Sequence, residues 1–278
     1  MIQDIAPHVY HNEYRPVPPD KDSIALYYEK HVCLLTQTAS GIRFPRFRDL
    51  ERLNDDIYEG AIYLFSIDNE RYYLISDVNR EPQSDFTMEN TMIFRTVEPQ
   101  HLAFAGITGY QLYRWYSTHK YCSCCGAPLR KDDKERMLYC DNCRIPEYPK
   151  ISPATIIAVT DGNRILLSKY AGRAYKKYAL LAGYVEIGET VEETVKREVM
   201  EEVGLKVKNI RYYKSQPWSF SDTVLMGFYC DLDGEDKITL DKEELALAEW
   251  FEREDLPVEP SRDSLTNEMI IKFKNNEI

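Results

Sequence analysis

The chain has 278 residues, of which 44% are hydrophobic and 29% charged, a composition typical of an ordinary globular protein. This length suffices for two modest domains, each with its own core. With 35 basic and 46 acidic residues the net charge is −11, which argues against a protein that coats nucleic acid or membranes. Anionic substrates are not excluded, because bound metal ions can supply local positive charge. No apolar run reaches about 18 residues, and the first residues lack a basic flank, so we expect neither a membrane span nor a signal peptide.

The first third of the chain has the pattern of a small β-rich domain. Residues 1 to about 98 contain short alternating hydrophobic runs, with a hairpin predicted from strands at 61–67 and 71–75 and another strand within 23–35. No catalytic constellation appears there, and the abundant tyrosines are best explained as half-buried strand surface. From Pro99 to His119 apolar residues recur every three or four positions, which predicts a connector helix.

A cluster of cysteines follows this helix. Five of the seven cysteines lie within 22 residues, which indicates a metal site in a reducing cytoplasm and not a disulfide framework. Two C-x-x-C pairs separated by fourteen residues have the spacing of ligands to one tetrahedral Zn²⁺: Cys122, Cys125, Cys140 and Cys143. Four thiolates leave no position for water, so we expect one structural zinc per chain. Cys124 is an alternative ligand, with Cys122 favoured by position. The basic residues between the pairs would also suit a nucleic-acid-binding module, but interspersed acidic residues dilute their charge.

The most informative stretch is residues 183–205. Thr190 and Glu193 have the form of a capping box, and Gly204 stands where a helix ends in a left-handed residue. Between them, valines recur every four positions and predict one apolar seam: Val191, Val195, Val199 and Val203.

Three carboxylates crowd another face of this predicted helix. Glu198, Glu201 and Glu202 stand at i, i+3 and i+4, where like charges repel by roughly 0.2–0.5 kcal/mol per pair. Oxygen donors at this spacing suit a hard divalent cation such as Mg²⁺ or Mn²⁺. The alternative is a solvated acidic face, which is the common outcome for charge runs.

Gly183, Glu189 and the segment from Arg197 to Leu205 resemble the Nudix box at all of its defining positions. This resemblance implies a loop–helix–loop that binds divalent metal and hydrolyses a nucleoside diphosphate linked to another group. It also implies an α+β fold, the Nudix α/β/α sandwich with a mixed sheet. The surrounding pattern agrees, with strands predicted at 154–160, 164–168, 178–182, 209–214, 223–231 and 247–251 and a closing helix at 264–273.

A second motif follows the strand predicted at 209–214. An aromatic pair that brackets small polar residues can stack on a base, although composition alone favours a buried pair in a loop. The motif, Ser215 to Thr223, resembles the SQPWPFPxS array of NADH pyrophosphatases, with serine at 219 and 221 in place of proline and Thr223 in place of the last serine. The zinc ribbon before the Nudix domain, the HKYC sequence at 119–122 and the ELALAEWF stretch at 244–251 are similar to the same family.

This family resemblance implies roles at matching positions. The metal ligands would be Glu198, Glu202, Glu244 and the carbonyl of Ala182. The catalytic residues would be Glu198, Glu201 and Glu202, with either Glu201 or Glu202 as the base. Structural roles are implied for Gly183, Glu189, Arg197 and Gly204, with Arg197 paired to Glu201 or Glu193. Substrate contacts are implied for Glu135, Tyr148, Tyr184, Gln216, Pro217, Trp218, Ser219, Phe220, Ser221, Asp222, Thr223 and Thr266.

We therefore expect a β-rich domain with its connector helix at 1–118, a zinc ribbon at 119–150 and a Nudix domain at 151–278. The expected function is metal-dependent hydrolysis of NAD(H) to AMP and nicotinamide mononucleotide by a cytoplasmic homodimer. NAD-capped RNA contains the same diphosphate and would be a further substrate. The altered prolines suggest an alternative, hydrolysis of ADP-ribose or a dinucleoside polyphosphate. A non-catalytic nucleotide sensor or nucleic-acid-binding regulator is the third hypothesis, but such proteins usually lack some of the glutamates, and all are present here.

Overall fold

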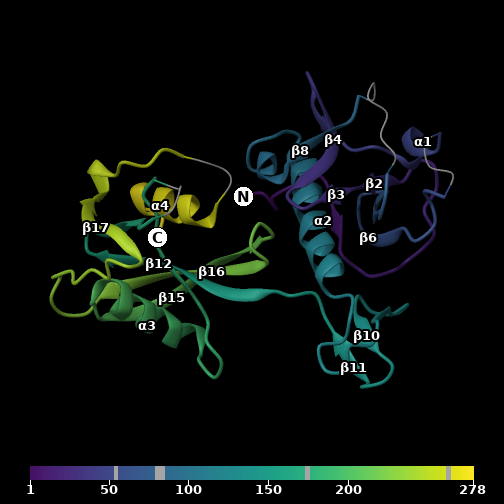
Figure 1. Cartoon of the computed structure of the whole chain (residues 1–278). Helices are drawn as coiled ribbons and strands as arrows, with labels where there is room; N and C mark the ends of the chain where they lie inside the picture. Colours follow the sequence, from purple (N-terminus) through teal and green to yellow (C-terminus); the bar gives the residue numbers. More distant parts are fainter. Residues whose placement is uncertain (53–55, 79–84, 173–175, 261–263) are drawn as a thin grey trace. The chain divides into compact units, whose positions relative to one another are not determined.

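The computed structural model describes residues 1–52, 56–78, 85–172, 176–260 and 264–278 (Figure 1). It divides into two compact units. The C-terminal unit comprises Met1, residues 151–218 and residues 222–278, and the N-terminal unit comprises residues 2–150 and 219–221. Within the described residues, no helix combines the length and hydrophobicity needed to cross a membrane.

The C-terminal unit is built on a six-stranded mixed sheet. Its strands are β12 (Ser152–Asp161), β13 (Arg164–Tyr170), β14 (Leu181–Tyr184), β15 (Val207–Trp218), β16 (Thr223–Leu232) and β17 (Leu245–Glu252). Their order is β15-β16-β12-β13-β17, and β14 also pairs with β12. The β12–β16 pair is parallel and the other pairs are antiparallel, as expected for a mixed sheet.

Two helices cover the two faces of this sheet, α3 (Val191–Val203) and α4 (Leu265–Lys274) (Figure 1). The alternation of side chains along β12 serves both faces. Ile156 and Ala158 belong to the core that contains α4, whereas Ile157 and Val159 belong to the core that contains α3. As predicted, the valine seam of α3 packs in the latter core, where Val195, Val199 and Val203 are buried and Val191 is partly buried. The α/β/α sandwich is therefore confirmed.

Two strands differ most from their predicted bounds. The strand expected at 178–182 is β14 at Leu181–Tyr184, so Gly183 lies within the strand and pairs with Thr155. The strand expected at 209–214 extends to Trp218, because residues 215–218 pair with the first residues of β16. The SQPW segment is thus part of a strand and not of a loop. Local propensity did not indicate this, since serine and proline are poor strand formers and only the pairing partner compensates.

The N-terminal unit is rich in short strands, as expected. These are β1 (Tyr10–His11), β2 (Ile24–Leu26), β3 (Tyr28–Glu29), β4 (Val32–Thr38), β5 (Gly41–Arg43), β6 (Ile62–Ile67), β7 (Glu70–Leu74) and β8 (Thr87–Asn90), with the short helix α1 (Phe47–Leu50) and a 3₁₀ turn at Thr91–Arg95. One sheet has the order β1-β6-β7-β2, and the other is formed by β3, β4, β5 and β8. The predicted hairpin is present as β6 and β7.

The connector helix is α2 (Gln100–Thr118), within one residue of its predicted bounds. It buries Phe104, Ile107 and Tyr110 against the strands of the N-terminal unit. Trp115 is also buried. A helix with this apolar face is held by packing and not by helix propensity alone.

The ribbon forms a small antiparallel sheet of β9 (Arg130–Lys131), β10 (Leu138–Cys140) and β11 (Ile145–Glu147). Its contacts place it in the N-terminal unit. Arg136 donates hydrogen bonds to Asn12 and to the carbonyl of Leu64, and the Tyr14 hydroxyl donates to the carbonyl of Asp132 at 3.2 Å. The domain boundary expected at 118/119 stays a prediction.

Candidate active site

Helix α3 is fixed at both ends. The Thr190 hydroxyl accepts from the Glu193 amide at 3.2 Å, and the Glu193 carboxylate accepts from the Thr190 amide at 2.8 Å. This is the predicted capping box, and the helix ends at Gly204, whose φ of 69° is left-handed. Glu193 is therefore used in the cap and has no ion pair with Arg197 among the described contacts.

Two of the three crowded glutamates are buried. Glu198 and Glu202, one helical turn apart, are 8% and 2% exposed. Burial raises the pKa of Glu198, Arg197 opposes that shift, and the charges of Glu201 and Glu244 raise the pKa further. A buried carboxylate with further negative charge nearby is costly unless a cation compensates it. The donor set therefore fits a divalent metal ion that takes oxygen ligands.

The Glu198 carboxyl group lies directly against the backbone of β14. A β-carbon built on Gly183 would be 1.8 Å from Glu198 Cδ, so this position admits no side chain while Glu198 keeps its place. The residue before it, Ala182, pairs with Ile156 in the sheet. The structure thus explains why the first residue of the box is glycine: it lets a buried carboxylate approach the strand.

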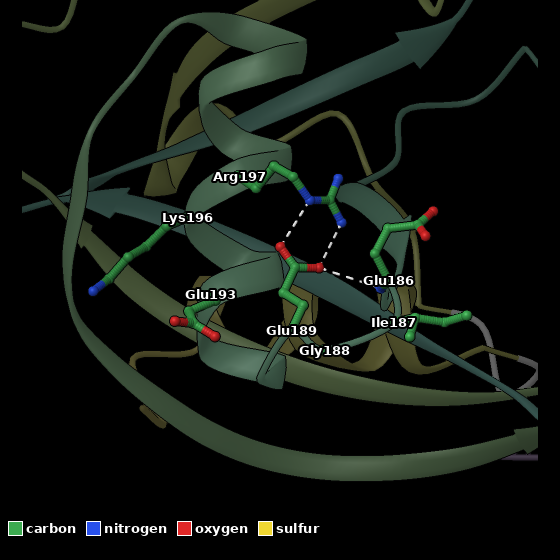
Figure 2. A pocket seen from close by; sticks show the side chains of 7 residues that line it. All are labelled: Glu186, Ile187, Gly188, Glu189, Glu193, Lys196 and Arg197. Atoms are coloured by element: carbon green, nitrogen blue, oxygen red, sulfur yellow. Dashed lines mark hydrogen bonds and ion pairs between the residues drawn. The ribbon is translucent and has the colours of Figure 1, made fainter.

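Arg197 connects the helix to the loop through Glu189 (Figure 2), and it also connects the helix to strand β14. Its guanidinium donates to both oxygens of Glu189 at 2.8 and 2.9 Å, and to the Tyr184 carbonyl at 3.0 Å. It also pairs with Glu198 at 2.7 Å and with Glu201 at 2.9 Å. The hydrogen bond from Arg197 is the main reason that the pKa of Glu189 falls to about 2. Glu189 and Arg197 form a bidentate pair that holds the loop on the helix.

The remaining acidic residues are more open. The Glu201 side chain is 58% exposed, and Glu244 is exposed immediately before β17, with its carbonyl accepting from the Ala171 amide at 2.9 Å. In the described part of the chain, only four cysteines bring three or more metal-binding atoms within 4.8 Å of one another. The glutamate oxygens lie farther from one another than the cysteine sulfurs do. Like charges repel, and Arg197 forms ion pairs with Glu198 and Glu201.

An open cavity of about 630 Å³ lies beside the box loop (Figure 2). Its lining residues are Glu186, Ile187, Gly188, Glu189, Glu193, Lys196 and Arg197. The Ile187 side chain is fully exposed. Among these residues, sequence reasoning gave no role to Glu186, Ile187 and Lys196. The sequence feature that could have indicated this cavity is Ile187, an apolar residue between Glu186 and Gly188.

The SQPW segment has mixed environments. Gln216 is fully buried, and its side-chain oxygen accepts from the Leu265 amide at 2.7 Å, at the start of α4. Pro217 is exposed and Trp218 is half-buried. Thr223 is buried, with its hydroxyl 3.4 Å from that of Tyr184, whose side chain is largely exposed.

Other predicted substrate residues complete the hairpin and the first turn of α4. Asp222 closes the β15–β16 hairpin with a left-handed φ of 56°, and its carbonyl accepts from the Ser152 amide at 2.7 Å. Thr266 is half-buried in the first turn of α4.

Five predicted substrate residues belong to the N-terminal unit: Glu135, Tyr148, Ser219, Phe220 and Ser221. The Tyr148 hydroxyl donates to the Glu135 carboxylate at 2.8 Å, and both side chains are accessible. Ser219 is buried, Ser221 is exposed and Phe220 packs on the core of the N-terminal unit. The carbonyls of Ser219 and Phe220 accept from Arg114, a contact that sequence reasoning missed because nothing distinguishes one arginine on a helix.

The four cysteines of the ribbon form a compact donor set. Their sulfur atoms all lie within 4.8 Å of one another, and Cys125 Sγ is 3.6 Å from Cys140 Sγ. Thiolates around tetrahedral zinc are separated by about 3.8 Å, as follows from a Zn–S bond of about 2.3 Å. Backbone hydrogen bonds from Cys125 and Cys124 lower the pKa of Cys122 to about 7, whereas hydrogen bonds with the thiols of Cys125 and Cys124 raise the pKa of Cys143. Cys124 is exposed and lies outside this group of four, and the choice of Cys122 as the ligand stays a prediction.

Comparisons with known proteins match two parts of the chain to domain families. Residues 150–271 match the NUDIX domain, and residues 117–148 match the NADH pyrophosphatase zinc ribbon domain. The chain is 41% identical over 163 residues to the NAD-capped RNA hydrolase NudC of Klebsiella pneumoniae subsp. pneumoniae, covering 58% of this chain and 63% of that protein. It is 40% identical over 162 residues to the protein of the same name from Salmonella schwarzengrund, with the same coverage. The matched part therefore spans less than two thirds of these relatives. A NUDIX hydrolase structure from Nitrosomonas europaea is 27% identical, with a TM-score of 0.43, covering 50% of this chain and 80% of that chain.

Proposed function

We propose that the protein hydrolyses the diphosphate bond of NAD(H), because residues 150–271 match the NUDIX domain and residues 117–148 match the NADH pyrophosphatase zinc ribbon domain. The products are AMP and nicotinamide mononucleotide. The observation that carries this proposal is the pair of buried carboxylates, Glu198 and Glu202, on the capped helix of the Nudix box.

The chemistry requires that negative charge on the diphosphate be offset before a water molecule can attack phosphorus. Glu198, Glu202 and Glu244, with the carbonyl of Ala182, would hold Mg²⁺ or Mn²⁺, which neutralises phosphate charge and acidifies water when bound. Arg197 and Glu189 hold the loop against the helix, and Arg197 also donates to the Tyr184 carbonyl. Glu201, whose carboxylate is open to solvent, accepts the proton of the attacking water. A new P–O bond forms to that water as the bridging P–O bond breaks.

Substrate recognition is assigned to the aromatic residues. We assign stacking on a planar group of the substrate to Tyr184 and Trp218, and a contact to the Thr223 hydroxyl, which lies 3.4 Å from that of Tyr184. NAD-capped RNA presents the same diphosphate, and the relatives named NAD-capped RNA hydrolase support it as a second substrate. We place the enzyme in the cytoplasm, where cysteine ligands stay reduced, and expect a homodimer.

Side-by-side turnover of NADH, ADP-ribose, a dinucleoside polyphosphate and NAD-capped RNA tests the assignment. We expect the highest kcat/KM on NADH or on the capped RNA. The serines at 219 and 221, in place of the family's prolines, favour ADP-ribose or a dinucleoside polyphosphate as the alternative. A preference for either compound would replace our proposal.

The role of the buried carboxylates is tested by Glu202→Gln. The variant should lose hydrolysis by at least about 10²-fold, because the neutral amide cannot offset the charge of a divalent cation. Glu192→Gln, on the exposed face of the same helix, is the matched control and should keep full activity. Full activity in Glu202→Gln would exclude the proposed metal site.

A further inference from the structure

Arg114 on α2 makes a forked contact with two consecutive carbonyls. Its Nη1 atom donates to the carbonyl of Phe220 at 3.0 Å, and its Nη2 atom donates to that of Ser219 at 2.6 Å. The same guanidinium lies 4.6 Å from the centre of the Tyr110 ring. All of these residues belong to the N-terminal unit, so this contact is internal to that unit.

The geometry uses properties that only arginine has. A planar guanidinium presents parallel donors to two acceptors while its face rests on an aromatic ring. Because the donor is charged, these hydrogen bonds are stronger than those between neutral groups. The Tyr110 ring is itself buried, which restricts the orientation of the guanidinium.

The two carbonyls lie in the connection between strands β15 and β16. β15 ends at Trp218 and β16 begins at Thr223, so Ser219 and Phe220 form part of the hairpin connection between them. Ser219 is buried and Phe220 packs on the core of the N-terminal unit. The connection is thus held through its backbone and is flanked on both sides by residues to which we assign substrate contacts.

We propose that Arg114 is a positioning residue for nucleotide recognition, which fixes the backbone of residues 219–220 and thereby the placement of the adjoining Trp218 and Thr223. This inference rests on the proposed function, because it assumes that these neighbours contact the nucleotide. It assigns to α2, outside the Nudix domain, a part in substrate specificity. Arg114 itself does not contact the reacting atoms.

The test compares Arg114→Ala, Arg114→Lys and a control, Arg71→Ala. Arg71 lies on β7 of the same unit and forms a partly exposed ion pair with Asp20, so its loss removes an arginine without touching the hairpin. Steady-state kinetics on NADH and hydrogen–deuterium exchange of the peptide spanning residues 216–224 are measured for all four proteins. Thermal unfolding is followed in parallel.

We expect Arg114→Ala to raise KM by about tenfold while kcat changes by less than about twofold, the signature of lost ground-state binding. Amide exchange should accelerate within residues 216–224 and stay at the wild-type rate elsewhere in the chain. Arg114→Lys should have a KM between those of the wild type and Arg114→Ala, since an ammonium group can donate to one carbonyl but cannot donate to both in the forked geometry. Arg71→Ala should match the wild type.

Unchanged exchange in the 216–224 peptide of Arg114→Ala would overturn the proposal, as would an unchanged KM in an active enzyme. Acceleration spread over the whole N-terminal unit would likewise overturn it, by making Arg114 a general stability residue. If wild-type protein turns over none of the nucleotides, the proposed function fails. The exchange measurement then still decides whether Arg114 holds the hairpin.

Discussion

At Gly183 the carboxyl group of Glu198 occupies the space that any other residue would need for its β-carbon. The box glycine and the box glutamate are fifteen positions apart in sequence but act as one packing unit. A substitution at either position therefore has a cost that depends on the other.

We predict that Gly183→Ala lowers the free energy of unfolding by about 1–3 kcal/mol, the usual cost of overpacking a filled site. In a Glu198→Ala background the same change should cost much less, because the obstructing carboxylate is gone. Urea unfolding of the four proteins in this double-mutant cycle measures the coupling. Equal costs in both backgrounds would show that Glu198 does not lie against Gly183.

A second residue-scale feature lies in the N-terminal unit, where His8 and His101 stack with ring centres 3.8 Å apart. Burial lowers the pKa of His101, and the neighbouring His8 lowers it further, while Glu70 and Asp68 act in the opposite direction. The His8 ring also bonds to Asp68 at 2.8 Å.

This arrangement predicts a loss of stability in mild acid. Since the folded pKa of His101 lies below the unfolded value of about 6.5, the unfolded state binds the proton more readily. The stabilisation is fully present above pH 6.5 or so and is lost as the pH falls toward the folded pKa. Denaturant unfolding of the wild type and His101→Gln between about pH 7.5 and 5 tests this. The free energy of unfolding should depend less steeply on pH in the variant than in the wild type. Parallel pH profiles would contradict the prediction.

Among the elements, α4 depends on a single buried side chain for its first amide. Gln216 was predicted from the sequence to contact substrate, and in the structure its side-chain oxygen accepts from the Leu265 amide at 2.7 Å. The first N–H groups of a helix have no partner within the helix, so a buried acceptor from another strand replaces water.

Gln216→Ala should therefore lower the free energy of unfolding by about 1–3 kcal/mol, the cost of leaving a buried polar group unsatisfied. Ser215→Ala, at the exposed neighbouring position, is the control and should be close to neutral. Thermal or urea unfolding decides the matter. A stable Gln216→Ala protein with a raised KM would instead place this side chain on the substrate.

At the scale of the whole molecule, we expect zinc binding to determine whether the N-terminal unit is fully folded. The ribbon carries Asp132 and Arg136, which bond to Tyr14, Asn12 and Leu64 in the rest of that unit. Metal binding to such a small domain contributes directly to its folding free energy. Loss of zinc should therefore loosen more than the ribbon.

Elemental analysis should find one zinc per chain in the purified protein. Cys122→Ser should reduce zinc content and lower the midpoint of thermal unfolding, because the remaining thiolates cannot complete a tetrahedral site. Cys124→Ser is the matched control and should retain the metal, since Cys124 lies outside the donor set. Zinc retained by the first variant and lost by the second would reverse the ligand assignment.

Several features follow from local sequence and were predictable from it. The ends of α3 depend on Thr190, Glu193 and Gly204, whose roles are set within a few residues of the chain. The ribbon depends on cysteine spacing, and α2 on apolar periodicity. In each case the interaction that specifies the structure joins residues close in sequence, so the pattern carries the information.

Tertiary structure alone decided the rest. The three glutamates look equivalent in sequence, yet the sheet buries Glu198 and Glu202 and leaves Glu201 in solvent beside Arg197. Pairing with β16 carries β15 through Trp218, and packing against α4 gives Gln216 its partner. Arg114 meets residues 219 and 220 only after the chain has folded. Each of these outcomes depends on the desolvation or hydrogen bonding of groups far apart in sequence. Local propensity cannot predict them, because it reflects only residues close together in the chain.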